Sequence, residues 1–156
     1  MRMSTDRTDE ILIGEMEKLL DDVAPSEADL AASYVQAEPE YERVQPEEKR
    51  YGIPGAGLAV LVGPILLHYV VVIAMDVLAA ARKKGAEAIA AELWNYLSSK
   101  VRRSLPAKDR GRTETIDAIV KALKAAGWDD ERAGAAADLA WESGIETGRR
   151  FSELVN

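Results

Sequence analysis

Cysteine is absent from the 156-residue sequence, and histidine occurs only once. Without cysteine the chain has no disulfide, no thiolate nucleophile, and no zinc or iron–sulfur site built on sulfur. A single histidine also excludes a multi-histidine metal site within one chain. Carboxylates are numerous, but they form no spaced metal-ligand or acid–base motif. We therefore expect no cofactor, no metal and no enzyme activity.

The sequence also lacks an even distribution of charge, although the net value is only −7. Residues 1–52 contain 6 Lys/Arg and 14 Asp/Glu, whereas residues 82–112 contain 9 basic and 3 acidic residues. A basic block directly after an apolar stretch is typical of sequences that lie beside a membrane or another anionic surface. The acidity of the chain as a whole argues against nucleic acid as a partner.

Charge is missing altogether from residues 53–75, IPGAGLAVLVGPILLHYVVVIAM, which are 23 consecutive residues without Asp, Glu, Lys or Arg. Eleven Leu, Ile or Val residues lie between Leu58 and Met75. Together they favour insertion into a bilayer by about 3–7 kcal/mol, and a membrane span needs about 20 residues. The residues predicted to face either lipid or the core of a helical bundle are Leu58, Leu61, Ile65, Leu66, Leu67, Val70, Val71 and Ile73.

Hydrophobic periodicity predicts helices over most of the chain. An acidic helical pair over residues 1–36 precedes an acidic, proline-containing linker over residues 37–52. Gly63-Pro64 divides the apolar stretch, because proline removes a backbone donor but suits the first turn of a helix. From Pro64 the pattern predicts one long helix to about residue 105, whose second half is basic and amphipathic. A helical hairpin over residues 113–156 completes the chain.

The predicted fold class is therefore all-α. We expect a bundle of about five helices around a long central apolar helix over residues 64–105, with membrane insertion as an option. The hydrophobic fraction of 47% is ordinary for a soluble domain. Insertion is thus permitted by the sequence but not required by it.

Part of the C-terminal sequence, LKAAGW followed by alanines and SGIETGRRF, resembles the ubiquitin-associated-like three-helix module. In that module a glycine–aromatic pair follows the first helix, and Gly127-Trp128 is the pair that carries the resemblance here. The resemblance covers about 40 residues. Residues 130–143 depart from it, because they form a longer helical pattern than the second helix of that family. No binding residue is carried over.

Two groups of polar residues are candidates for function on or beside the apolar helix. His68 and Asp76 share one face but are separated by about 12 Å along the axis, which is too far for an acid–base pair. They predict either a pH-sensitive or pore-lining face, or a satisfied buried histidine and an ordinary surface acid. Contacts with an anionic surface are predicted for Arg82, Lys83, Lys84, Lys100, Arg102 and Arg103.

Two functions follow from these patterns. The first is a membrane-associated helical protein, an anchor or a pore-forming effector that uses residues 53–81 against a lipid bilayer. The alternative is a soluble, oligomeric helical-bundle interaction or adaptor module that buries the apolar helix among partner helices. Self-association is expected in both. The polar N-terminus lacks the apolar core of a signal peptide, so we expect cytoplasmic synthesis and a membrane-associated or cytoplasmic location.

Overall fold

The computed structural model describes residues 5–36, 61–81, 87–100 and 111–155. This part of the chain contains helices and no strand, so the predicted all-α class is confirmed. The predicted linker over residues 37–52 lies outside the described residues. The helices, in chain order, are α1 (Thr5–Val23), the 3-10 helix η1 (Pro25–Leu30), α2 (Ala31–Gln36), α5 (Gly63–Ala81), α6 (Glu87–Ser98), α7 (Arg112–Ala125) and α8 (Asp130–Val155).

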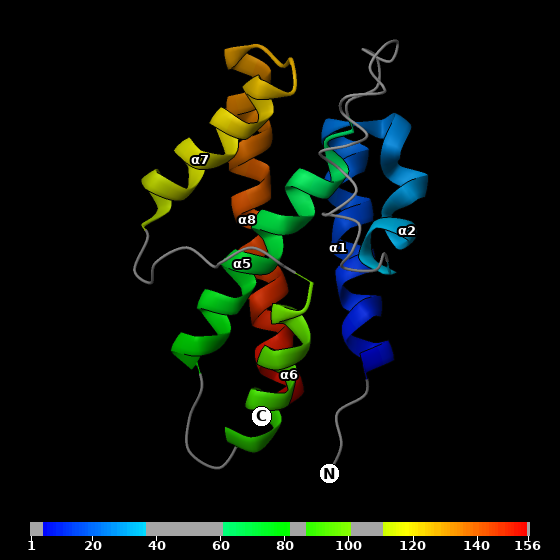
Figure 1. Ribbon diagram of the computed structural model, residues 1–156, viewed down its shortest axis with the longest axis vertical. Helices are drawn as coiled ribbons and strands as arrows, with labels where there is room; N and C mark the ends of the chain where they lie inside the picture. Colours follow the sequence, from blue (N-terminus) through cyan, green and yellow to red (C-terminus); the bar gives the residue numbers. More distant parts are fainter. Residues whose placement is uncertain (1–4, 37–60, 82–86, 101–110, 156) are drawn as a thin grey trace.

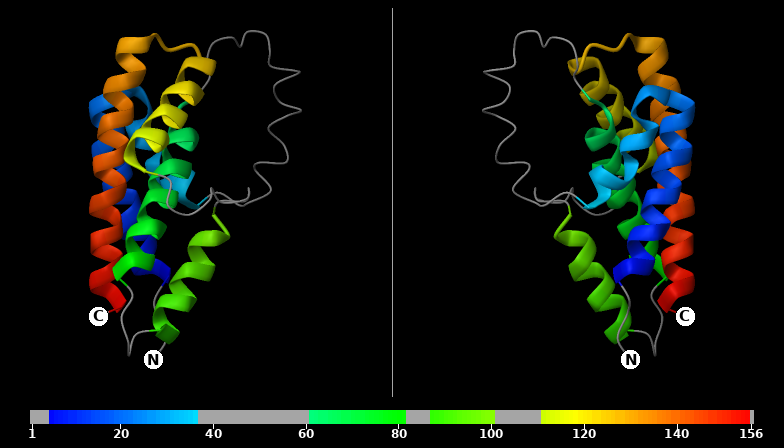
Figure 2. Two further views of the ribbon diagram at one scale, coloured as in Figure 1. Left: turned by 90° about the vertical axis from the view of Figure 1, so that its left-hand side faces the viewer. Right: turned by 90° about the vertical axis from the view of Figure 1, so that its right-hand side faces the viewer.

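α5 lies in the middle of the bundle (Figure 1). α8 crosses α5 and also packs against α1, while α7 packs on α8 and α2 lies beside α1 (Figures 1 and 2). The most extensive helix–helix contact is that between α5 and α8. The beginning of α1 and the end of α8 lie at the same end of the bundle.

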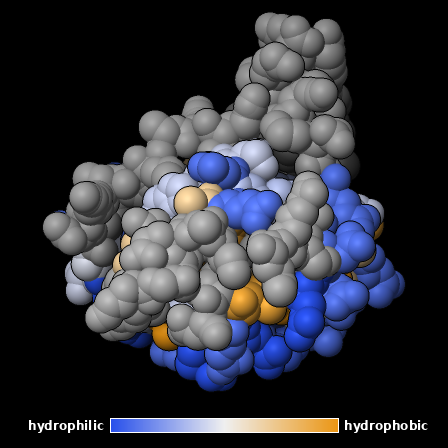
Figure 3. Space-filling view, turned by 90° about the horizontal axis from the view of Figure 1, so that it is seen from below, coloured by the Kyte–Doolittle hydropathy of each residue, from blue (hydrophilic) through white to orange (hydrophobic). Residues whose placement is uncertain are grey.

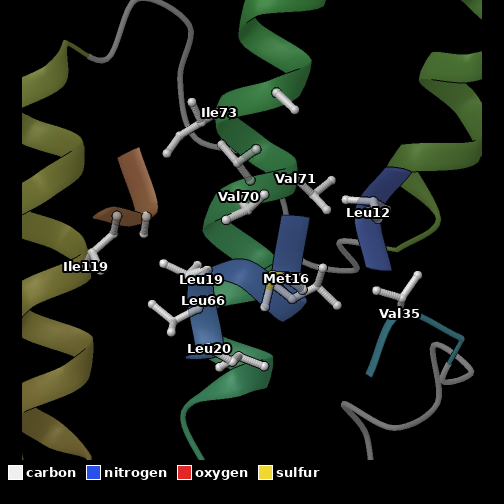
Figure 4. Close-up of a cluster of buried hydrophobic side chains, with 14 of the residues drawn as sticks. Leu12, Met16, Leu19, Leu20, Val35, Leu66, Val70, Val71, Ile73 and Ile119 are labelled. Atoms are coloured by element: carbon white, nitrogen blue, oxygen red, sulfur yellow. The ribbon is translucent and has the colours of Figure 1, made fainter. Parts of the chain in front are cut away.

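One core fills the space between these helices, and α5 is at its centre. Figure 4 shows Leu12 of α1 and Val35 of α2 on one flank of α5, and Ile119 of α7 on the other. All three side chains are at most 1% exposed. The amphipathic helices thus supply the cover that an apolar helix requires in water.

The single long helix predicted over residues 64–105 is wrong. α5 ends at Ala81 and α6 begins at Glu87, and Figures 1 and 2 show α6 running back in the opposite direction. Periodicity alone allowed a continuous helix, because one glycine in a helix costs only about 1 kcal/mol. Folding α6 back buries Leu93 and Leu97 completely. Burial of a leucine side chain contributes about 1.5–3 kcal/mol, so tertiary packing outweighs the local preference.

Gly127 joins α7 to α8 with a φ of 104°, a conformation that glycine adopts without a steric penalty. The Trp128 N–H donates to the Leu123 carbonyl at 3.1 Å, which closes the end of α7. Asp129 begins α8 by accepting the backbone N–H of Arg132 at 2.8 Å. α8 then continues as one helix of 26 residues. The resemblance to a three-helix ubiquitin-associated-like module therefore does not extend to the fold.

Candidate functional site

The residues predicted to face lipid or a helical core are distributed as follows. Leu61, which precedes α5, is 41% exposed, and Leu58 lies outside the described residues. Ile65 is partly buried against the core. The remaining five are buried among neighbouring helices, each at most 9% exposed: Leu66, Leu67, Val70, Val71 and Ile73.

Within the described ranges, no helix combines the length and the apolar character that crossing a membrane requires.

The two polar residues predicted to form a functional face of α5 differ in their surroundings. His68 is half-buried, and its ring meets that of Tyr69 edge-on with centroids 5.0 Å apart. Asp76 is exposed. The structure does not bring His68 and Asp76 together, because they remain two helical turns apart on one helix. In the part of the chain that is described, no three His, Asp or Glu side chains could hold a metal ion.

A buried carboxylate, that of Glu27 in η1, holds the beginning of α5. Glu27 is only 8% exposed. Its carboxylate oxygens accept the backbone N–H groups of Val62 at 3.0 Å and Gly63 at 2.8 Å, and the Tyr34 hydroxyl donates to it at 2.8 Å. The first N–H groups of a helix have no partner within the helix, and negative charge is favourable at this end. Glu27 therefore anchors α5 to the N-terminal part of the chain, and we call this arrangement the Glu27 anchor.

Two neighbouring residues make the Glu27 anchor compact. Pro64 has no backbone N–H, so the helix presents one donor fewer to be satisfied. The Tyr34 ring occupies the space where a Cβ on residue 63 would lie, so Gly63 is required for this approach. Gly63-Pro64 thus does more than begin a helix, because it also creates the space for Tyr34 and Glu27.

α8 approaches α5 through two glycines, Gly144 and Gly148, which lie four residues apart on one face. A Cβ on Gly144 would lie 2.6 Å from the Cβ of Ile73. A Cβ on Gly148 would lie 2.5 Å from the Cβ of Val77 and 2.9 Å from the Ala74 carbonyl oxygen. The separation of packed helices depends on the side chains at the contact, so glycine allows the two backbones to come close. We call this contact the glycine seam.

An ion pair also connects the first and the last described helices. Glu15 of α1 is 5% exposed, and its carboxylate lies 3.2 Å from the Arg150 Nε of α8. The same guanidinium lies 3.2 Å from the Glu146 carboxylate. A buried carboxylate needs such a partner, because an unpaired charge in the interior is strongly destabilising.

α6 is attached to α1 and α2 by two polar side chains near its end. The Tyr96 hydroxyl donates to Asp9 Oδ1 at 2.6 Å, and Lys100 Nζ donates to the Val35 carbonyl at 2.5 Å. Lys100 Nζ also lies 3.8 Å from Asp9 Oδ1 and 5.0 Å from the centre of the Tyr96 ring. Only 12% of the Lys100 side chain is exposed. Lys100 is thus engaged within the bundle, whereas the other predicted surface cations, Arg82, Lys83, Lys84, Arg102 and Arg103, lie outside the described residues.

The hydrogen bond between Tyr96 and Asp9 leads to a prediction about alkaline pH. Burial raises the pKa of the Tyr96 hydroxyl above its ordinary value, and Asp9 raises it further. An unfolded tyrosine ionises near pH 10, while the folded protein keeps the Tyr96 proton to higher pH. Tyr96 therefore stabilises the fold fully below about pH 10, and this contribution is lost as the pH rises further.

We expect the urea midpoint of the wild-type chain to fall above about pH 10 more steeply than that of Tyr96→Phe. At neutral pH the phenylalanine variant should be less stable by about 1 kcal/mol, because it lacks the hydroxyl. Identical pH profiles for the two chains would contradict the assignment.

The sequence predictions missed the residues that hold α5 in place. The spacing of Gly144 and Gly148 was a readable signal, since small residues four apart mark one face of a helix. Glu27 gave no local signal, because its backbone partners lie 35 and 36 residues further along the chain.

Comparison with known proteins found no matching family model, no similar curated protein and no similar solved structure.

Proposed function

We propose that this chain is a helical-bundle interaction module in which α5 is the permanent core. The observation that carries the proposal is the burial of six consecutive residues, Val70 to Met75, each at most 5% exposed. Six residues make more than one helical turn, so every side of α5 is covered at this level. A helix that is covered on all sides by amphipathic neighbours has the environment of a core helix.

The outer surface supports the same proposal. Viewed from the end where α1 begins and α8 ends, the described surface is largely hydrophilic, with a small apolar area (Figure 3). On α8, Arg149 pairs with Glu146 at 2.6 Å and with Glu153 at 3.0 Å. Charged helix faces of this kind are typical of helices that turn their polar side to water and their apolar side to the core.

The second candidate function is a membrane-perturbing effector that releases α5 on a trigger. It is favoured by the chemical contrast between α5 and the rest of the bundle, since one strongly apolar helix is enclosed by amphipathic ones. In this alternative the Glu27 anchor would be a restraint that must open before α5 can leave the core.

Leakage of a fluorophore from vesicles that contain anionic lipid distinguishes the two functions. As an interaction module, the full chain is expected to cause no leakage, and Glu27→Ala is expected to cause none while it remains folded. Asp29→Ala is the matched control, because Asp29 is an exposed acid in the same 3-10 helix. Leakage by the wild-type chain that increases in Glu27→Ala, but not in Asp29→Ala, would favour the membrane-perturbing effector.

A further inference from the structure

We draw no further inference here: the strongest candidate, the half-buried stripe of α5 formed by Ile65, His68 and Tyr69, carries none, because nothing in the described part of the chain shows what covers it.

Discussion

Replacing both Gly144 and Gly148 with alanine is expected to lower the free energy of unfolding by roughly 2–6 kcal/mol. That is a large part of the stability of a domain, which is about 5–15 kcal/mol. The new Cβ atoms would lie 2.6 Å from the Cβ of Ile73 and 2.5 Å from the Cβ of Val77, so α8 would have to move away from α5. Overpacking of this kind costs about 1–3 kcal/mol for each site. Urea denaturation of the two single variants and the double variant measures the effect.

Gly134 in the same helix offers a control, because its replacement by alanine is expected to stabilise the protein. Nothing lies within 4 Å of a Cβ built on Gly134, which is also within α8. Gly134→Ala should therefore raise the free energy of unfolding by about 0.5–1 kcal/mol, because alanine favours the helix and restricts the unfolded chain. If Gly144→Ala and Gly148→Ala stabilise the protein as Gly134→Ala does, α8 and α5 do not meet through a glycine seam.

The sequence predicts where helices begin and end at those positions where adjacent residues determine the boundary. α5 begins at Gly63, where the Gly63-Pro64 pair predicted a helix start. Gly127 ends the helix before it because its left-handed conformation suits glycine. These features depend on two or three adjacent residues, and such short patterns define helix ends.

The environment of α5 was not readable, because lipid and a protein core select the same apolar residues. Leu66 and Val70 are apolar and would be equally favourable in lipid or in a protein core. Their burial depends on the faces of other helices, such as the small-residue face of α8 that includes Ala137, Ala140 and Gly144. Hydropathy along one segment contains no information about such a partner, so only the assembled bundle distinguishes the two environments.

The path of the chain after α5 depended on long-range contacts in the same way. The hydrogen bond from Tyr96 to Asp9 joins residues 87 positions apart, and that from Lys100 to Val35 joins residues 65 apart. A single helix over residues 64–105 satisfies the local periodicity equally well. It would, however, forfeit both of these bonds and leave Leu93 and Leu97 without their cover.

Removing the carboxylate of Glu27 is expected to destabilise the fold by at least roughly 3–6 kcal/mol, the contribution of its two buried backbone hydrogen bonds. Glu27→Ala leaves the backbone N–H groups of Val62 and Gly63, and the Tyr34 hydroxyl, without their acceptor. Hydrogen bonds to a charged group contribute about 1.5–3 kcal/mol each. Water compensates little, because both backbone bonds are buried. The measurement is urea denaturation at neutral pH, with Asp29→Ala expected to remain within about 0.5 kcal/mol of wild type.

Two milder variants separate the Glu27 anchor from the general effect of losing a side chain. Glu27→Gln keeps one acceptor oxygen, so it should lose about half of what Glu27→Ala loses. Tyr34→Phe removes one bond and leaves the carboxylate on the α5 terminus.

If Tyr34 and Glu27 act as one unit, the double variant Glu27→Ala/Tyr34→Phe should be no less stable than Glu27→Ala alone, because the acceptor for the hydroxyl is already gone. Additive losses would mean that the Tyr34 hydroxyl stabilises the fold through a group other than Glu27. A stability of Glu27→Ala equal to that of Asp29→Ala would show that the beginning of α5 is held by other contacts.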